Sequence, residues 1–135
     1  MLRVILVVAP APGQVALVAT ALEDTPLASL HAAPALEDAA RQIARPHTLQ
    51  VDADARFEGA EGALAVISGL AGTMEGTIGF VTSAEVVRAV LLHALDAPVP
   101  HDRLALDEGA VAEVEVRTDA PWTVNRINDA CHLVG

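Results

Sequence analysis

The stretch TIGFVTSAEVVRAVLLHAL, residues 77–95, decides the fold. Residues 78–81 form a short apolar run typical of a strand, Thr82-Ser83 offers a turn or a helix cap, and a long apolar helix begins at Ala84. In open α/β folds ligands bind at such a corner, because the sheet stops there and the helix amino terminus presents unpaired N–H groups. We therefore expect any functional site to lie near Ser83.

Other apolar segments alternate with helical ones around this unit. Residues 2–9 form a near-continuous run rich in Val and Ile, which predicts a central strand buried on both faces. We expect further strands at residues 27–32, 48–51, 110–118 and 122–127, and helices at residues 14–22, from Pro34 to a stop at Pro46, and at residues 61–71. Gly62 and Gly69 either weaken the last of these helices or allow it to pack closely.

The carboxyl-terminal part predicts a hairpin. Ala112, Val114 and Val116 share one face of a strand, and Glu113, Glu115 and Arg117 share the other. Residues 119–121 turn the chain back, whereas residues 52–56 and 96–103 read as polar or proline-held connections. The pattern predicts an α/β fold: a three-layer αβα sandwich with a mostly parallel sheet and a C-terminal antiparallel hairpin, in one domain of residues 1–135.

Composition excludes several classes of function. A hydrophobic content of 53% with 19% charged residues excludes a disordered chain. The net charge of −10 argues against binding nucleic acid or an anionic membrane, and it disfavours anionic substrates. The single cysteine, Cys131, cannot form an internal disulfide, and the apolar residues 60–74 are too short to span a bilayer. Pro10 and Pro12 interrupt the amino-terminal apolar run, which disfavours a signal peptide, so we expect a cytoplasmic protein without membrane contact.

The deciding stretch also resembles the histidine phosphatase superfamily, which includes the cofactor-dependent phosphoglycerate mutases. In that family a catalytic histidine lies in Val-Ser-His-Gly-Gly, followed by a helix beginning Val-Ile-Arg-Ala. Here residues 81–85 read Val-Thr-Ser-Ala-Glu and residues 86–89 read Val-Val-Arg-Ala. Ser83 therefore holds the histidine position.

Both ends of the chain extend the resemblance. The family's Arg-His-Gly-Glu motif, which carries the nucleophilic histidine, corresponds to residues 8–11, with Ala9 at the nucleophile. Ala32-Ala33-Pro34 matches the approach to a helix whose phosphate-binding arginine corresponds to Glu37 or Asp38. Residues 107–111 and 128–133 resemble the family's Asp-Asn-Ala-Ser-Val and Asn-Asp-Thr-Ser-His-Leu. A long segment with a lid and an acidic proton donor is missing between residues 51 and 76, where Glu58 is the nearest carboxylate.

The resemblance implies a shortened phosphoglycerate mutase-like fold without its activity. Transfer through phosphohistidine needs an imidazole nucleophile, and alanine cannot form the intermediate. It also needs cationic donors around the phosphoryl group, and Val8 and Glu37 or Asp38 stand where arginines are expected. We predict a pseudoenzyme with neither phosphatase nor mutase activity.

The fold would bring one set of residues to the former pocket. The expected ligand-binding residues are Ala9, Pro10, Thr82, Ser83 and Glu85, with Glu37 beside them. Candidate catalytic residues are Ser83, Glu85, Glu37, Glu58 and His31, although a helix cap is the favoured role for Ser83 and packing for His31. This lining suits a neutral or cationic small organic molecule, or no ligand.

No cofactor or metal is expected. The five histidines show no metal-ligand spacing, and Asp52 and Asp54 read as a solvated loop rather than half of a cation site. His93 reads as a helix-end residue, and His101-Asp102 is a weaker candidate for an oriented base.

Three hypotheses of function follow. The first is a degenerate domain that binds a small molecule or a protein partner. The second is a repurposed enzyme, such as a lyase, an isomerase or a cyclase, that uses an acidic residue or a histidine as acid or base. The third is a homodimer formed through the apolar surface that the missing lid exposes.

Overall fold

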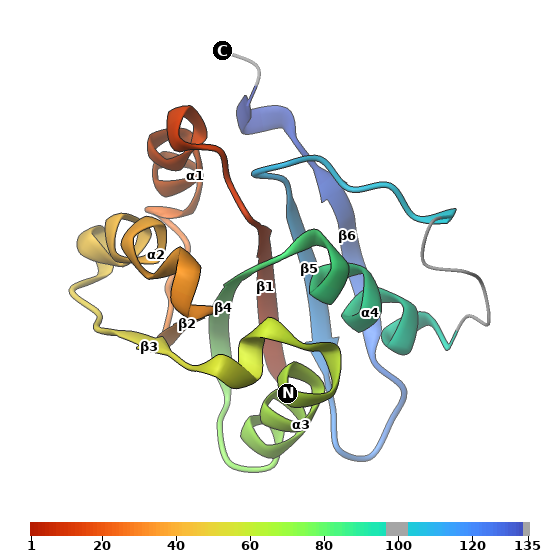
Figure 1. Cartoon of the computed structure of the whole chain (residues 1–135). Coiled ribbons are helices and arrows are strands. Elements are labelled where there is room, and N and C mark those ends of the chain that lie inside the picture. The colour runs from red at the N-terminus through yellow and green to blue at the C-terminus, as the bar shows by residue number, and fades with distance from the viewer. Residues whose placement is uncertain (97–102, 134–135) are drawn as a thin grey trace.

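The computed structural model describes residues 1–96 and 103–133 (Figure 1). The strands form a six-stranded sheet in the order β3-β2-β4-β1-β5-β6. Their bounds are β1 (Leu2–Val8), β2 (Ser29–Ala32), β3 (Val51–Ala53), β4 (Gly76–Thr82), β5 (Val111–Val116) and β6 (Thr123–Asp129). The α-helices are α1 (Val15–Leu22), α2 (Glu37–Ala44), α3 (Ala60–Ala71) and α4 (Ala84–Leu95). Short 3₁₀ turns are η1 (Pro12–Gln14), η2 (Pro34–Leu36), η3 (Arg45–His47), η4 (Ala55–Glu58) and η6 (Cys131–Leu133).

The sheet is mixed. Strands β3, β2, β4 and β1 are parallel, and β5 pairs antiparallel with both β1 and β6. The predicted α/β architecture, with a mostly parallel sheet and a C-terminal hairpin, is therefore confirmed.

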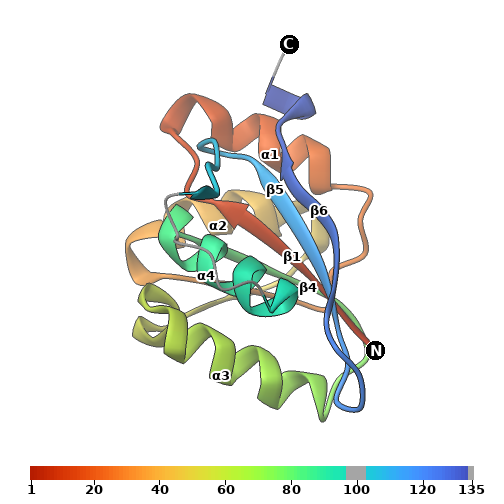
Figure 2. The same cartoon turned by 90° about the vertical axis from the view of Figure 1, so that its right-hand side faces the viewer.

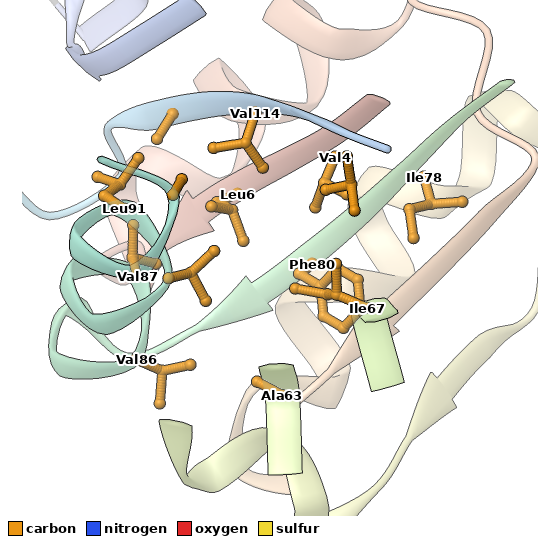
Figure 3. Packing of buried hydrophobic residues seen from close by; sticks show 14 of the residues in the cluster. Val4, Leu6, Ala63, Ile67, Ile78, Phe80, Val86, Val87, Leu91 and Val114 are labelled. Carbon is orange, nitrogen blue, oxygen red and sulfur yellow. The ribbon is translucent and has the colours of Figure 1, made fainter. Parts of the chain in front are cut away.

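Helices cover both faces of the sheet (Figure 2). Ile5 and Val7 of β1 pack with side chains of α1 and α2, whereas the alternate residues of β1 pack with α3 and α4. Figure 3 shows the hydrophobic cluster on the α3 and α4 face, in which Leu6 and Phe80 lie among side chains from α3, α4 and β5. Residues 4–8 of β1 are buried on both faces and are all apolar, whereas Arg3 near the start of the strand is exposed.

The third strand corrects the sequence-based prediction. A strand was expected at residues 48–51 and a loop at 52–56, but β3 spans Val51–Ala53 and the irregular segment begins at Asp54. Thr48 adopts a left-handed conformation (φ 53°) after η3, so the chain is still turning where the strand was predicted. Asp52 then lies opposite His31 in the pairing of β3 with β2.

Other boundaries shift by one or two residues. The strand predicted at 27–32 begins at Ser29, and the hairpin strands are Val111–Val116 and Thr123–Asp129. Most of the connection predicted at 96–103 lies outside the described residues. Within the described ranges, none of the helices has both the length and the apolar character that crossing a membrane requires.

The two glycines in α3 have different roles. A Cβ atom on Gly62 would overlap the carbonyl oxygen of Arg56, so this glycine allows η4 to pack against α3. A Cβ atom on Gly69 would meet nothing within 4 Å. Gly62 is therefore required by packing, whereas Gly69 only weakens the helix.

We expect Gly62→Ala and Gly69→Ala to change stability in opposite directions. Gly62→Ala should lower the free energy of unfolding by about 1–3 kcal/mol, because the overlap forces the backbone to shift. Gly69→Ala should raise it by about 0.5–1 kcal/mol, because alanine loses less conformational entropy in a helix. Urea denaturation followed by the fluorescence of Trp122, the only tryptophan, measures both. Equal effects of the two substitutions would contradict the packing role of Gly62.

Candidate functional site

The carboxyl ends of β1 and β4 meet side by side. The two strands pair in register up to Val8 and Thr82, and the N–H of Ala9 donates to the carbonyl of Thr82 at 2.8 Å. The residues that follow, Ala9 and Ser83, are therefore neighbours. They lie where the parallel strands end, and we call this end of the sheet the edge. The N–H of Ala33 donates to the carbonyl of Val81 at 3.1 Å, which brings the segment before η2 to the same edge.

Ser83 caps helix α4. Its backbone is extended, and its Oγ accepts a hydrogen bond from the N–H of Val86 at 3.3 Å. Its carbonyl accepts from the N–H of Val87 at 3.0 Å. Glu85 follows in the first turn of α4 and is exposed, where the helix dipole favours a negative charge.

Thr82 uses its hydroxyl within the fold. The side chain is 1% exposed, and its Oγ donates to the carbonyl of Phe57 at 2.6 Å. This bond ties the end of β4 to η4, the turn that leads into α3. Pro10 is half-buried beside Ala9 at the end of β1.

The remaining predicted carboxylates face solvent. The Glu37 carboxylate lies 3.3 Å from the guanidinium of Arg41, which also lies 3.6 Å from Asp38. Glu58 ends η4 and is exposed. The pocket-lining carboxylates expected from the sequence are thus at the molecular surface.

Asp52 and Asp54, which were considered from the sequence as half of a cation site, each bond to a neighbouring side chain. Asp54 accepts from the side chain and from the backbone N–H of Arg56, and both bonds hold the pKa of Asp54 below its usual value. Asp52 bonds to His31 instead. Within residues 1–96 and 103–133 no three His, Cys, Asp or Glu side chains gather as a metal site would require.

His31 is buried and both of its ring nitrogens have partners. Nδ1 lies 2.9 Å from Oδ2 of Asp52, and Nε2 lies 2.9 Å from Oγ of Ser29. The ring also stacks on Phe80 and meets Phe57 edge-on. Sequence reasoning named His31 but missed Ser29, although their i, i+2 spacing already places them on one face of a strand.

His93 is exposed and meets the ring of Trp122 edge-on. Nε2 of His132 lies 2.8 Å from the carbonyl of Gly109, whose N–H donates to the carbonyl of Val8 at 3.0 Å, so His132 lies on the β5 side of the end of β1. His101, predicted as an oriented base, lies outside the described residues. In helix α4, Nε of Arg88 is buried without a hydrogen-bond partner among the described residues.

An open concavity of about 440 Å³ lies at the opposite end of the sheet. It is lined by Met1, Arg3, Glu75, Gly76 and Thr77, where β1 and β4 begin. This hollow is therefore separate from the edge that holds Ala9 and Ser83.

Comparison with solved structures identifies the fold, whereas no family model and no curated protein sequence matches the chain. Bacillus stearothermophilus YhfR superposes with a TM-score of 0.84 at 13% identity, covering 98% of this chain and 100% of that one. A mycobacterial glucosyl-3-phosphoglycerate phosphatase, in complex with VO3, gives 0.81 at 10% identity, covering 94% and 99%. A phosphoglycerate mutase from Plasmodium falciparum gives 0.70 at 10% identity, covering 93% and 89%. The fold is that of histidine phosphatases and phosphoglycerate mutases, as the sequence predicted.

Ser83→Ala should lower the free energy of unfolding by about 0.5–2 kcal/mol, because the N–H of Val86 loses its cap. Ser83→Asn, which keeps a capping oxygen, should stay within a few tenths of a kcal/mol of the parent. Urea denaturation of the three proteins measures the difference. The capping role is wrong if the asparagine variant is as unstable as the alanine variant.

Proposed function

We propose that this chain, which has the histidine phosphatase fold, is a degenerate domain that does not transfer phosphate. In this proposal it binds a neutral or cationic small organic molecule, or a protein partner, at the carboxyl edge of β1 and β4. One observation carries the proposal: Ala9 and Ser83 lie side by side at the positions where the resemblance expects the two catalytic histidines.

The chemistry of these two side chains supports the loss of phosphoryl transfer. A methyl group has no lone pair, so Ala9 cannot form a covalent phosphoryl intermediate. The hydroxyl of Ser83 already accepts the helix-capping bond from Val86. Among the described residues, no basic side chain is hydrogen-bonded to this hydroxyl to activate it as a nucleophile.

Charge supports the same conclusion. Glu37 stands at the expected arginine position, and the nearby Arg41 is paired with Glu37 and Asp38. Two like unit charges at 4 Å repel by about 1 kcal/mol in water, the medium that surrounds the exposed Glu85. A phosphate dianion that approaches Glu85 in the first turn of α4 therefore meets repulsion, whereas a cation meets attraction.

We place binding ahead of repurposed catalysis as a lyase, an isomerase or a cyclase. General acid–base chemistry favours a carboxylate held in a closed apolar cavity, where its pKa can be matched to the reaction. Glu58 and Glu85 are exposed, and Glu37 is engaged by Arg41. These positions suit attraction of a ligand better than proton transfer.

The proposal predicts no release of phosphate from p-nitrophenyl phosphate above the buffer rate, since alanine stands at the edge position where the resemblance expects the nucleophilic histidine. It also predicts no stabilisation by orthovanadate, a phosphate mimic, in a thermal melt. Steady-state and rapid-mixing absorbance measurements test the first point. A burst of product that Ser83→Ala abolishes would contradict the proposal.

The charge of the edge can be tested with benzamidine, an aromatic cation. We expect it to shift the amide resonances of Ala9 and Ser83 in a two-dimensional NMR titration. Glu85→Gln should weaken this binding about fivefold, which corresponds to about 1 kcal/mol for a charge at 4 Å in water.

Glu61→Gln is the matched control, because Glu61 is the second residue of α3 as Glu85 is the second residue of α4. It should leave the titration unchanged. Perturbation by vanadate instead of benzamidine, or an equal effect of the two substitutions, would refute the proposed ligand class.

A further inference from the structure

We propose that Ser29, His31 and Asp52 form a second site, which hydrolyses small activated carboxylic esters. Oγ of Ser29 lies 2.9 Å from Nε2 of His31, and Nδ1 of His31 lies 2.9 Å from Oδ2 of Asp52. Hydroxyl, imidazole and carboxylate are thus linked in the order that activates a serine nucleophile.

For a neutral His31 beside an ionised Asp52, the hydrogen bonds select one tautomer. An ionised carboxylate can only accept, so Nδ1 of a neutral His31 must carry the proton that bonds to Asp52. Nε2 is then unprotonated, and it accepts the hydroxyl proton of Ser29. This is the tautomer in which an imidazole can act as a general base toward a serine.

Strand geometry brings the three side chains together. Ser29 and His31 are two residues apart on β2, so they project from the same face of the sheet. Asp52 of β3 pairs directly with His31, which places it on that face as well. The intervening Leu30 is buried in the core on the opposite face, with side chains of α1 and α2.

Aromatic packing holds the imidazole in place. The ring stacks on Phe80 with 4.8 Å between centroids and an interplanar angle of 22°, and it meets Phe57 edge-on at 5.6 Å. A ring fixed on two sides keeps Nε2 directed at Ser29, which favours catalysis by positioning.

Two of the three side chains are accessible from solvent, and the three residues are separate from the edge proposed above. Ser29 is half-buried, and the Asp52 side chain is 53% exposed. Ser29 is the first residue of β2, whereas Ala9 and Ser83 follow the last residues of β1 and β4, which run parallel to β2. A failure of one proposal therefore leaves the other standing.

The reaction is a two-step acyl transfer to water. Oγ of Ser29 attacks the ester carbonyl, His31 takes the hydroxyl proton and returns it to the leaving oxygen, and the alcohol departs. Water then attacks the acyl-serine ester, again giving a proton through His31, and releases the acid and free Ser29. Because general acid–base catalysis contributes about 10²–10⁴-fold, we expect substrates with good leaving groups, such as aryl esters of short acids.

Covalent labelling with a fluorophosphonate tests the nucleophile. Oγ of Ser29 would displace fluoride from phosphorus, and His31 would take the proton. We expect one adduct per folded chain by intact mass spectrometry, mapped to Ser29, and none on heat-denatured protein. The folded protein should also hydrolyse p-nitrophenyl acetate, and Ser29→Ala should abolish both reactions.

Asp52 acts through His31 and is tested as a positioning residue. Asp52→Asn should slow labelling at least tenfold, because an amide no longer selects the tautomer, and Asp52→Glu should recover part of the rate. Asp54→Asn is the matched control, since that nearby carboxylate bonds to Arg56 and should leave labelling unchanged.

Asp52 is exposed, so these variants should fold, and a thermal melt verifies this. No adduct on Ser29 of the folded protein would overturn the proposal. Labelling rates that are equal for Asp52→Asn and Asp54→Asn would also overturn it, because they would reduce the three residues to a structural hydrogen-bond network.

Discussion

The parallel pairing of β1 with β4 is the constraint on which the rest of the structure depends. Seven residue pairs, from Leu2 with Gly76 to Val8 with Thr82, run between strands that are buried for most of their length. Because the two strands end at the same level, the residues that follow them become neighbours whatever their side chains are. The position of the edge site is thus set by main-chain hydrogen bonds and by the apolar core, while the side chains at positions 9 and 83 remain free to differ.

The bonds that hold this edge use groups that are independent of phosphate chemistry. The Thr82 hydroxyl bonds to the carbonyl of Phe57, the N–H of Ala33 bonds to Val81, and Ser83 caps α4. None of these bonds needs an imidazole or a guanidinium. This explains how the fold of histidine phosphatases is kept at identities of 10–13% to solved structures while alanine and serine stand at the two edge positions.

Strong local patterns made most of the fold predictable from the sequence. The apolar run of residues 4–8 in β1, the alternation in β5 and the serine cap before α4 each specify one structure, and the resemblance supplied the topology. The three-residue strand β3 has no such pattern, because its position depends on pairing with β2 after the left-handed turn at Thr48. For the same reason the contact of His31 with Asp52, 21 residues away, could not be predicted: a shift of one residue in β3 would point the carboxylate to the other face.

The acidic composition and the proposed loss of phosphate binding are both connected with where the arginines lie. Of the eight basic residues, five form ion pairs with the chain's own carboxylates in the described structure: Arg3, Arg41, Arg56, Arg117 and Arg126. Such pairs are mostly exposed and each contributes little stability. They do neutralise the charge of these arginines, which is then less available to a ligand. The net charge of −10 is in line with the proposal that the edge binds a neutral or cationic molecule rather than a phosphate ester. A pocket for phosphate would need guanidiniums aimed at the strand ends, and Arg41, on the helix that the resemblance aligns with that role, is paired with Glu37 and Asp38.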